Sequence, residues 1–207
     1  MKLPASTARR QGKSAKNLAV APGSIPPHER IVAVAREMFC RDGIHATGID
    51  RILAAAGASK MTLYARFGSK DALLREVLTR EGAAWRAAYF AAVIDATTAA
   101  GDPLHHLIAG LGTLFHRDAF YGCAFMNAIA EHTKGEAWLR DLAAEHHRLI
   151  LGFLGAHATT AGFDTPDITA RQLLLLLDGC MAALMVTGDA AVLEIAERNL
   201  HAILRRD

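Results

Sequence analysis

Residues 43–70, GIHATGIDRILAAAGASKMTLYARFGSK, carry the signals that decide the fold. Their pattern predicts two short helices, over about 48–56 and 60–67, and the start of a third. A serine stands directly before the second and the third helix, where its hydroxyl can accept a hydrogen bond from a free backbone N–H. A glycine follows each of the first two helices, where a left-handed residue commonly ends a helix. This arrangement predicts two helices joined by a tight turn, rather than one continuous helix.

The start of the first short helix has a further signal. Thr47 is placed to cap it, and Asp50 lies three residues later, where a capping-box carboxylate would stand. The second short helix has an apolar stripe formed by Leu63 and Phe67, four residues apart, and a polar opposite face. Such a helix fits the DNA major groove, and its free N–H groups can bind phosphate. From the residues alone, an ordinary packed hairpin with a solvated face explains the pattern equally well.

The stretch ATGIDRILAAAGASKMTLYARFGSKDALL, with RIVAVAREMFCRDGIHAT upstream, resembles the DNA-binding signature of the tetracycline-repressor (TetR) family. The shared features are the opening Thr, the A-A-G turn, S-K-x-T-L-Y and F-x-S-K-x-x-L-L, with A-x-x-x-F and G-x-x-A-T before them. The match covers roughly residues 29–78. It implies an all-α bacterial transcriptional regulator, with an N-terminal three-helix helix-turn-helix DNA-binding domain. A C-terminal helical domain for ligand binding and dimerisation would complete the roughly nine helices of the family.

The resemblance also implies which residues contact DNA. Carried over position by position, they are Thr47, Gly48, Ser59, Lys60, Met61, Thr62, Tyr64 and Lys70. Lys60 and Met61, at the amino end of the recognition helix, are best placed for base edges, and the polar others serve mainly the phosphates. Gly48, Met61 and Ala65 depart from the residues common in the family, which predicts an unusual base preference.

The charges divide the chain into a basic front and an acidic back. Residues 1–80 hold 14 Lys and Arg against 6 Asp and Glu, whereas residues 81–207 hold 9 against 15. This asymmetry is typical of a molecule that presents one end to a polyanion. We expect a disordered basic arm over 1–27, a helix-turn-helix domain over 28–80, and an effector-binding and dimerisation domain over 81–207. The sequence leaves open whether the arm contacts DNA.

Composition predicts a cytoplasmic protein that has no membrane partner. No long uncharged apolar run is present, and the N-terminus lacks the apolar core of a signal peptide. Cys40, Cys123 and Cys180 show no CxxC or Cys/His ligand spacing, so we expect free thiols and no metal. No cofactor is expected either.

Helical patterns continue through the rest of the chain. Besides a helix over about 28–42, the sequence predicts helices over about 70–95, 103–116, 124–132, 136–158, 168–187 and 189–205. Asp102 and Asp167 are placed to cap two of them, and Gly110 and Gly112 suggest close approach of another backbone. The helix over 168–187 is apolar around most of its circumference, so a second subunit is the expected cover. Helices 168–187 and 189–205, including Leu184 and Leu200, are therefore predicted to form the homodimer interface.

The body is interpreted as an effector pocket. Its predicted lining consists of Trp85, Tyr89, Phe115, Phe125, Met126, Asn127, Trp138, His146, Phe153 and Met181, mostly aromatic and sulfur side chains with a few polar groups. Simple core packing is the alternative for each residue. The body histidines leave open a helical small-molecule-binding or metal-binding enzyme, but they form no catalytic or metal signature, so no catalytic residue is predicted.

The predicted function is a ligand-responsive regulator. The resemblance implies a repressor that binds a palindromic operator in double-stranded DNA as a homodimer and is released by an unknown small molecule. The helix over 70–95 is expected to be the only continuous element touching both pocket and DNA-binding unit. Gly82, within it, either allows another helix to pack closely or marks the point where the helix bends, since glycine costs about 1 kcal/mol there relative to alanine.

Overall fold

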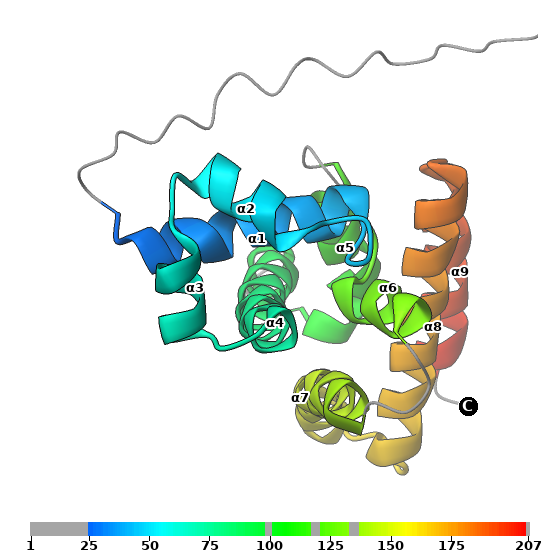
Figure 1. Ribbon diagram of the computed structural model, residues 1–207. Coiled ribbons are helices and arrows are strands. Elements are labelled where there is room, and N and C mark those ends of the chain that lie inside the picture. Colours follow the sequence, from blue (N-terminus) through cyan, green and yellow to red (C-terminus); the bar gives the residue numbers. More distant parts are fainter. Residues whose placement is uncertain (1–24, 98–100, 117–120, 133–136, 206–207) are drawn as a thin grey trace, which may run out of the picture.

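The computed structural model describes residues 25–97, 101–116, 121–132 and 137–205, and the regular structure in these ranges is helical throughout (Figure 1). The elements are α1 (Pro27–Asp42), α2 (Ile49–Ala56), α3 (Lys60–Arg66), α4 (Lys70–Ala96), the 3-10 turn η1 (Pro103–His106), α5 (Leu107–Phe115), α6 (Ala124–Glu131), α7 (Ala137–Thr160), α8 (Pro166–Thr187) and α9 (Ala191–Leu204). The all-α class is therefore confirmed. Most of the basic arm expected over 1–27 lies outside the described residues.

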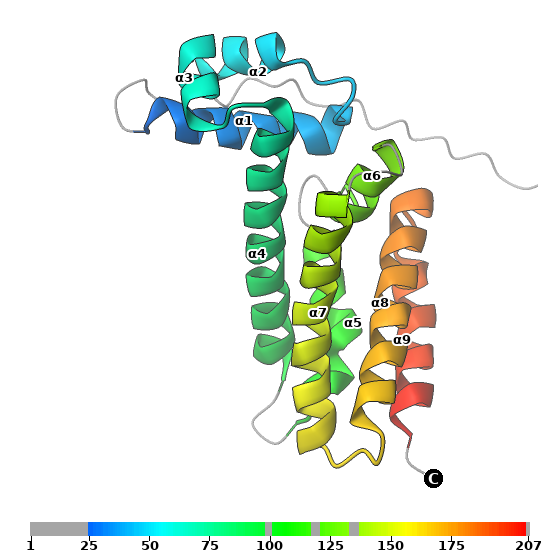
Figure 2. The ribbon, with the colours of Figure 1, turned by 60° about the horizontal axis from the view of Figure 1, so that its bottom comes forward.

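The helices form a small head and a longer body (Figure 2). Helices α1, α2 and α3 make the head at one end, and α4 runs from the head along the body. Helices α5, α7, α8 and α9 lie beside one another in the body, while the short α6 lies between the body and the head. The head core contains fully buried aliphatic side chains from α1, α2, α3 and the first part of α4, namely Ile31, Ile52, Leu63 and Leu73. Full burial of such a side chain is worth about 1.5–3 kcal/mol, which fixes the head as one unit.

Serine caps stand at the starts of α3 and α4, as predicted. The Ser59 hydroxyl accepts a hydrogen bond from the Thr62 amide at 3.1 Å, and the Ser69 hydroxyl accepts one from Ala72 at 3.0 Å. Gly57 ends α2 in the left-handed conformation, with φ of 57°. Gly57 and the Ser59 cap thus mark the turn between α2 and α3, and the Ser69 cap marks the start of α4.

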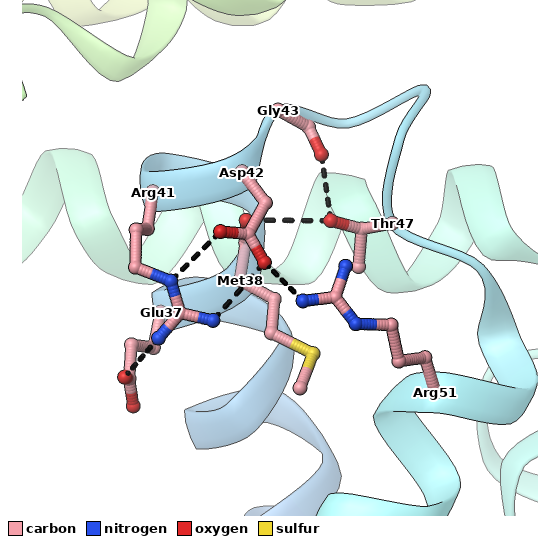
Figure 3. Close-up of polar contacts among 7 residues, drawn as sticks. All are labelled: Glu37, Met38, Arg41, Asp42, Gly43, Thr47 and Arg51. Carbon is pink, nitrogen blue, oxygen red and sulfur yellow. Dashed lines mark hydrogen bonds and ion pairs between the residues drawn. The ribbon is translucent and has the colours of Figure 1, made fainter. Parts of the chain in front are cut away.

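The predicted cap of α2 is wrong. Gly48 is the N-cap residue and supplies no side chain, while Thr47 is fully buried. The Thr47 hydroxyl donates instead to the Gly43 carbonyl at 2.7 Å and lies 3.3 Å from that of Met38 (Figure 3). Asp50 completes no capping box. Thr47 therefore closes the loop between α1 and α2 rather than starting α2.

Two aspartates were expected to cap helices of the body. Asp102 does so, because its carboxylate accepts from the Leu104 amide at 3.0 Å at the start of η1. Asp167 does not, since α8 begins at Pro166 and its N-cap residue is Thr165. Proline at the first position of a helix removes an N–H that would have no partner, so α8 starts without a side-chain cap.

Asp42 joins the end of α1 to α2 (Figure 3). Its carboxylate accepts hydrogen bonds from Arg41 at 2.8 and 3.0 Å and from Arg51 of α2. Glu37 holds Arg41 from the other side at 2.9 Å. The hydrogen bond from Arg41, supported by Arg51, lowers the pKa of Asp42 to about 2, so the carboxylate is ionised at neutral pH. This network orients α2 on α1 and thereby supports α3.

Helix α8 presents both a buried and an exposed apolar face. Leu184 of α8 and Leu200 of α9, expected at the dimer interface, are 1% and 0% exposed within one protomer, so that expectation is wrong for these two residues. Leu175, Val186 and Ile195 of the same two helices are 76%, 80% and 61% exposed. By length and composition α8 could cross a membrane, which is weak evidence because a core helix passes the same test.

Helices α4 and α5 approach closely at Gly110, as the sequence suggested. A Cβ atom on Gly110 would lie 2.6 Å from Val93 Cγ2 and 3.2 Å from the Val93 backbone nitrogen. Backbone cannot move aside as a flexible side chain can. By contrast, a Cβ on Gly152, in α7, would have no heavy atom within 4 Å.

We therefore expect opposite effects from two glycine substitutions. Gly110→Ala should lower the free energy of unfolding by about 1–3 kcal/mol, because the added methyl group forces α4 and α5 apart. Gly152→Ala should raise it by about 0.5–1 kcal/mol, because alanine restricts the unfolded chain at no steric cost. Urea denaturation measures both values. Equal stability of the two variants would contradict the close approach.

Candidate DNA-binding and effector sites

Helix α3 is anchored on one side and open on the other. Leu63 is fully buried in the head, whereas Met61 and Tyr64 are 80% and 51% exposed. Lys60 stands with them at the open, amino-terminal part of the helix. The exposed side chains of a seven-residue helix thus form a small, protruding surface of the kind that enters a DNA major groove.

Lys60 forms an exposed ion pair that is easily broken. Its ammonium group lies 2.8 Å from the Asp50 carboxylate, and both side chains are largely exposed. The hydrogen bond to Asp50 raises the pKa of Lys60, so the amine is protonated at neutral pH. An exposed ion pair of this type adds little stability, and exchanging Asp50 for a base edge therefore costs little.

The other residues expected at the DNA divide into two groups. Gly48 and Ser59 are exposed beside α3, and Thr62 is half-buried with its hydroxyl 3.0 Å from that of Ser59. Thr47 and Lys70 are engaged within the head: Thr47 is buried, and the Lys70 ammonium group donates to the Ile44 carbonyl at 2.6 Å. The expected contact between the Thr47 hydroxyl and phosphate is therefore wrong, because that hydroxyl is inaccessible.

Most other basic residues of the head also have internal partners. Arg36 pairs with Glu81, Arg51 with Asp42, and Arg80 with Glu29 and Glu76. Arg30 donates to the Ala56 and Gly57 carbonyls at 2.8 and 2.9 Å, which closes the carboxyl end of α2. Arg66, at the end of α3, is exposed and makes no hydrogen bond or ion pair with the described residues. The free positive charge of the head therefore lies on and beside α3.

The body contains a cavity between α4, α6, α7 and α8. It encloses about 300 Å³ of empty space, counting its open mouth, and its walls are Glu81, Gly82, Trp85, Gly122, Cys123, Ala124, Phe125, His146 and Met181. Four of the predicted effector residues meet here: Trp85, Phe125, His146 and Met181. The other six, Tyr89, Phe115, Met126, Asn127, Trp138 and Phe153, are absent from the lining.

Some of these six have evident other roles. Tyr89 is fully buried and donates to the Leu107 carbonyl at 3.1 Å, so it belongs to the core behind Trp85. Phe153 stacks on Phe90, with ring centres 4.1 Å apart. Asn127 donates to the Tyr121 carbonyl at 2.9 Å. An aromatic residue at helical spacing predicts burial, but it does not predict which cavity the residue faces.

His146 is the best-connected polar group of this cavity. It is 6% exposed, stacks on Phe125 at 4.4 Å between ring centres, and meets Trp85 edge-on at 5.7 Å. Arg86 Nη1 lies 2.7 Å from its Nδ1. Burial, and then the charge of Arg86, lowers the pKa of His146 to about 4, so the ring is neutral at pH 7. No pattern in the sequence pointed to Arg86, because one arginine in a long helix is ordinarily solvated.

Neither metal binding nor thiol chemistry is indicated in the described part of the chain. Its residues include no group of three or more His, Cys, Asp and Glu side chains that could hold a metal ion. Cys40, Cys123 and Cys180 are free, as predicted. Burial raises the pKa of all three thiols, that of Cys40 to about 11, so they are protonated at neutral pH.

Comparison with known proteins decides between a packed hairpin and a DNA-binding one. The family model described as "Bacterial regulatory proteins, tetR family" matches residues 31–77, which run from within α1 through α2 and α3 into α4. A crystal structure of SCO4454, a TetR-family transcriptional regulator from Streptomyces coelicolor, matches at 29% identity with a TM-score of 0.76, covering 86% of this chain and 94% of that one. The chain belongs to the TetR family of bacterial regulatory proteins.

Two further proteins match this chain over both the head and the body. The HTH-type transcriptional regulator YjdC of Escherichia coli (strain K12) is 23% identical over 180 residues, which cover 86% of this chain and 93% of that protein. The crystal structure of reduced E. coli NemR is 18% identical, with a TM-score of 0.74, and covers 87% of this chain and 98% of that one. At that identity, NemR supports the fold alone.

As a TetR-family protein, this chain is a DNA-binding transcriptional regulator and not an enzyme. The enzyme alternative is set aside by these matches in the head and by the full-length likeness to regulators. The helix-turn-helix predicted from the cap signals is α2 and α3.

In this TetR-family protein, α6 also links body and head, which corrects the expectation that α4 alone does so. Glu131, the last residue of α6, accepts hydrogen bonds from the Ile44 and His45 amides at 2.7 and 2.9 Å. Gly43 makes room for this carboxylate, since a Cβ there would lie 3.2 Å from Glu131 Oε2. His45 also bonds the Glu131 carbonyl and stacks on His132. The loop before the helix-turn-helix is thus held by the body.

Removing this carboxylate should release the loop. In Glu131→Ala, we expect the Ile44 and His45 amides to exchange with solvent at least about tenfold faster, because a hydrogen bond to a charged group is worth roughly 1.5–3 kcal/mol. Hydrogen exchange followed by nuclear magnetic resonance measures this at single amides. Glu145→Ala, which removes an exposed body glutamate paired with Arg148, serves as the control and should leave both rates unchanged. Unchanged exchange in Glu131→Ala would contradict the attachment.

Proposed function

We propose that this regulator is a repressor that binds a palindromic operator as a homodimer and is released by a small-molecule effector. The supporting observation is the pairing of an open α3 surface in the head with a small, largely apolar cavity in the body. We assign the head to residues 28–80, the effector and dimerisation domain to 81–207, and the protein to the cytoplasm, where its DNA target lies. The DNA contacts proposed are Gly48, Ser59, Lys60, Met61, Thr62, Tyr64 and Lys70.

The homodimer is proposed to form through α8 and α9. Their outer face holds the exposed Leu175, Val186 and Ile195. Beside these side chains lies a shallow hollow lined by Leu175, Leu176, Gly179, Cys180, Ala183, Val192, Ile195, Ala196 and Asn199. Apolar side chains next to small residues allow helices of a second copy to pack closely. Two copies joined there would form a four-helix interface and place two α3 helices on one operator.

The test of this interface uses Leu175 rather than a residue of the protomer core. Leu175→Glu should yield folded monomers, because dimerisation would bury an unpaired charge at a cost of about 3–5 kcal/mol. Sedimentation equilibrium gives the mass, and far-ultraviolet circular dichroism checks that the helices remain. Ile94→Glu alters a 45% exposed isoleucine on α4 and should leave the dimer intact. A Leu175→Glu protein that dimerises like wild type would place the interface elsewhere.

Binding as a dimer sets the spacing of the DNA target. Each α3 would enter the major groove of one half-site, and the two half-sites would lie about 34–36 Å apart or at a multiple of this distance. Selection from a random duplex library should therefore yield an inverted repeat. Enrichment of direct repeats, or of no sequence, would refute the proposed operator.

Lys60 and Lys70 are proposed to have different roles at the operator. Lys60→Ala should cost about 1–3 kcal/mol of binding free energy and relax the preference at one base pair. Lys70→Ala should weaken binding to all sequences alike and reduce the salt slope by about one. Because Lys70 also holds Ile44, thermal melting of the free variant must accompany the binding titrations. Equal, sequence-independent losses in both variants would contradict the division of roles.

Release by an effector is proposed to act through α6 as well as α4. Phe125 lies in the first turn of α6 and lines the cavity, while Glu131 at the other end of α6 holds the loop of the head. A ligand that moves Phe125 therefore acts on an element that is bonded to the head. Gly82 supports this path as a packing glycine: it is buried in an unbroken α4, and a Cβ there would lie 2.9 Å from the Phe125 ring. Of the two alternatives for Gly82, close packing is proposed and a bend of α4 is not.

A further inference from the structure

Two hydrogen-bond donors lie in or beside the cavity, on His146 and on Arg86. Arginine donates only, so Nδ1 of His146 must accept the bond from Arg86. A neutral imidazole then carries its single proton on Nε2. This Nε2–H has no hydrogen-bond partner among the described residues, although the ring is 6% exposed. A donor that is not bonded to any described protein group therefore remains in a ring that lines the cavity.

Arg86 forms no ion pair with the residues that the structure describes. Its guanidinium lies beside the cavity, since Nη1 is 2.7 Å from Nδ1 of His146, which lines the cavity. Its one hydrogen-bond acceptor in the described part of the chain is the neutral His146 ring. Burial lowers the pKa of Arg86, and the more distant charge of Glu145 opposes that effect. An arginine remains protonated at pH 7 even so.

The acidic groups nearby are already paired. Glu81 lines the cavity, but its two carboxylate oxygens bind Nε and Nη2 of Arg36. Glu145 is exposed and binds Arg148 at 2.6 Å through each of its oxygens. Asp178, the other carboxylate near this cavity, lies 3.5 Å from His147, so Arg86 is left without an ion-pair partner among the described residues, next to the apolar surfaces of Trp85, Phe125 and Met181.

We propose that the effector is a small organic carboxylate with a flat apolar body. This inference rests on the effector site proposed above and names its chemical class. The carboxylate accepts hydrogen bonds from Arg86 and from Nε2 of His146. The apolar body lies against Trp85 and Met181 and displaces the Phe125 ring, which otherwise closes the space beside Gly82. An uncharged ligand would leave Arg86 unpaired, and a cationic ligand would be repelled by it.

The test compares acids with uncharged molecules of the same shape. Benzoate and 2-naphthoate are titrated by calorimetry into the full-length protein without DNA, beside benzamide and 2-naphthamide. We expect the better acid to bind at least about tenfold more tightly than its amide, because hydrogen bonds to charged groups are the stronger ones. Equal affinities, tighter binding of the amides, or no binding of either acid at millimolar concentrations would overturn the proposal.

Variants assign the charge preference to one side chain. Arg86→Gln should lose the preference for acid over amide, and Arg86→Lys should keep part of it. Arg171→Gln is the matched control, since that arginine of α8 is exposed and does not line the cavity, and it should behave as wild type. An acid preference that survives in folded Arg86→Gln would also overturn the proposal. If this variant fails to fold, the comparison of acids with amides in wild type still decides.

The operator selection described above is independent of this test. A wild-type protein that selects an inverted repeat but prefers amides to acids would refute the carboxylate alone. A protein that binds acids yet selects no DNA sequence would instead refute the proposed repressor.

Discussion

Burial of α4 in two separate cores is the constraint on which the molecule depends. Leu73, Leu74, Val77 and Leu78 are buried in the head, and Tyr89 and Val93 are buried in the body on the same continuous helix. Neither set can be exposed without losing about 1.5–3 kcal/mol for each large side chain. The position of the head is therefore tied to the packing of the body, and a shift of α4 cannot remain local.

Helix α6 provides a second attachment between the body and the head. Glu131 holds two backbone amides of the loop that precedes the helix-turn-helix, and Lys70 holds the Ile44 carbonyl from the start of α4. The same loop is thus bound by α6 and by α4. If these two helices move relative to one another, at least one of the charge-assisted hydrogen bonds must lengthen. The position of the loop before α2 therefore depends on both helices.

The cavity lies where such a displacement can begin. Its walls come from α4, α6, α7 and α8, and Phe125 at the start of α6 stacks on His146 of α7. Since the pKa of His146 is lowered to about 4, Arg86 carries the positive charge of this cluster at neutral pH. The residues that give the cavity its charge and apolar surface therefore belong to the helices that contact the head or pack against those helices. That overlap is what a ligand needs in order to favour one arrangement of head and body over another.

The sequence by itself determined the helices and the DNA-binding motif, because these depend on contacts a few residues apart. The Ser59 and Ser69 caps, the left-handed Gly57 and the apolar spacing of α3 all act over one helical turn, and the structure has each of them as predicted. Thr47 shows the limit of this reasoning: a threonine before a helix is typical of a cap, yet tertiary packing buries it and bonds it to the preceding loop.

Only the tertiary structure could bring Glu131 to residues 44 and 45, or Arg86 to His146, since these partners are separated by 86 or more and by 60 positions. The packing of distant helices likewise decides which aromatic residues line the cavity. It also decides which face of α8 is buried and which is exposed. Hydrophobic patterning predicts that a side chain is buried, but the partner that buries it is set by the assembled fold.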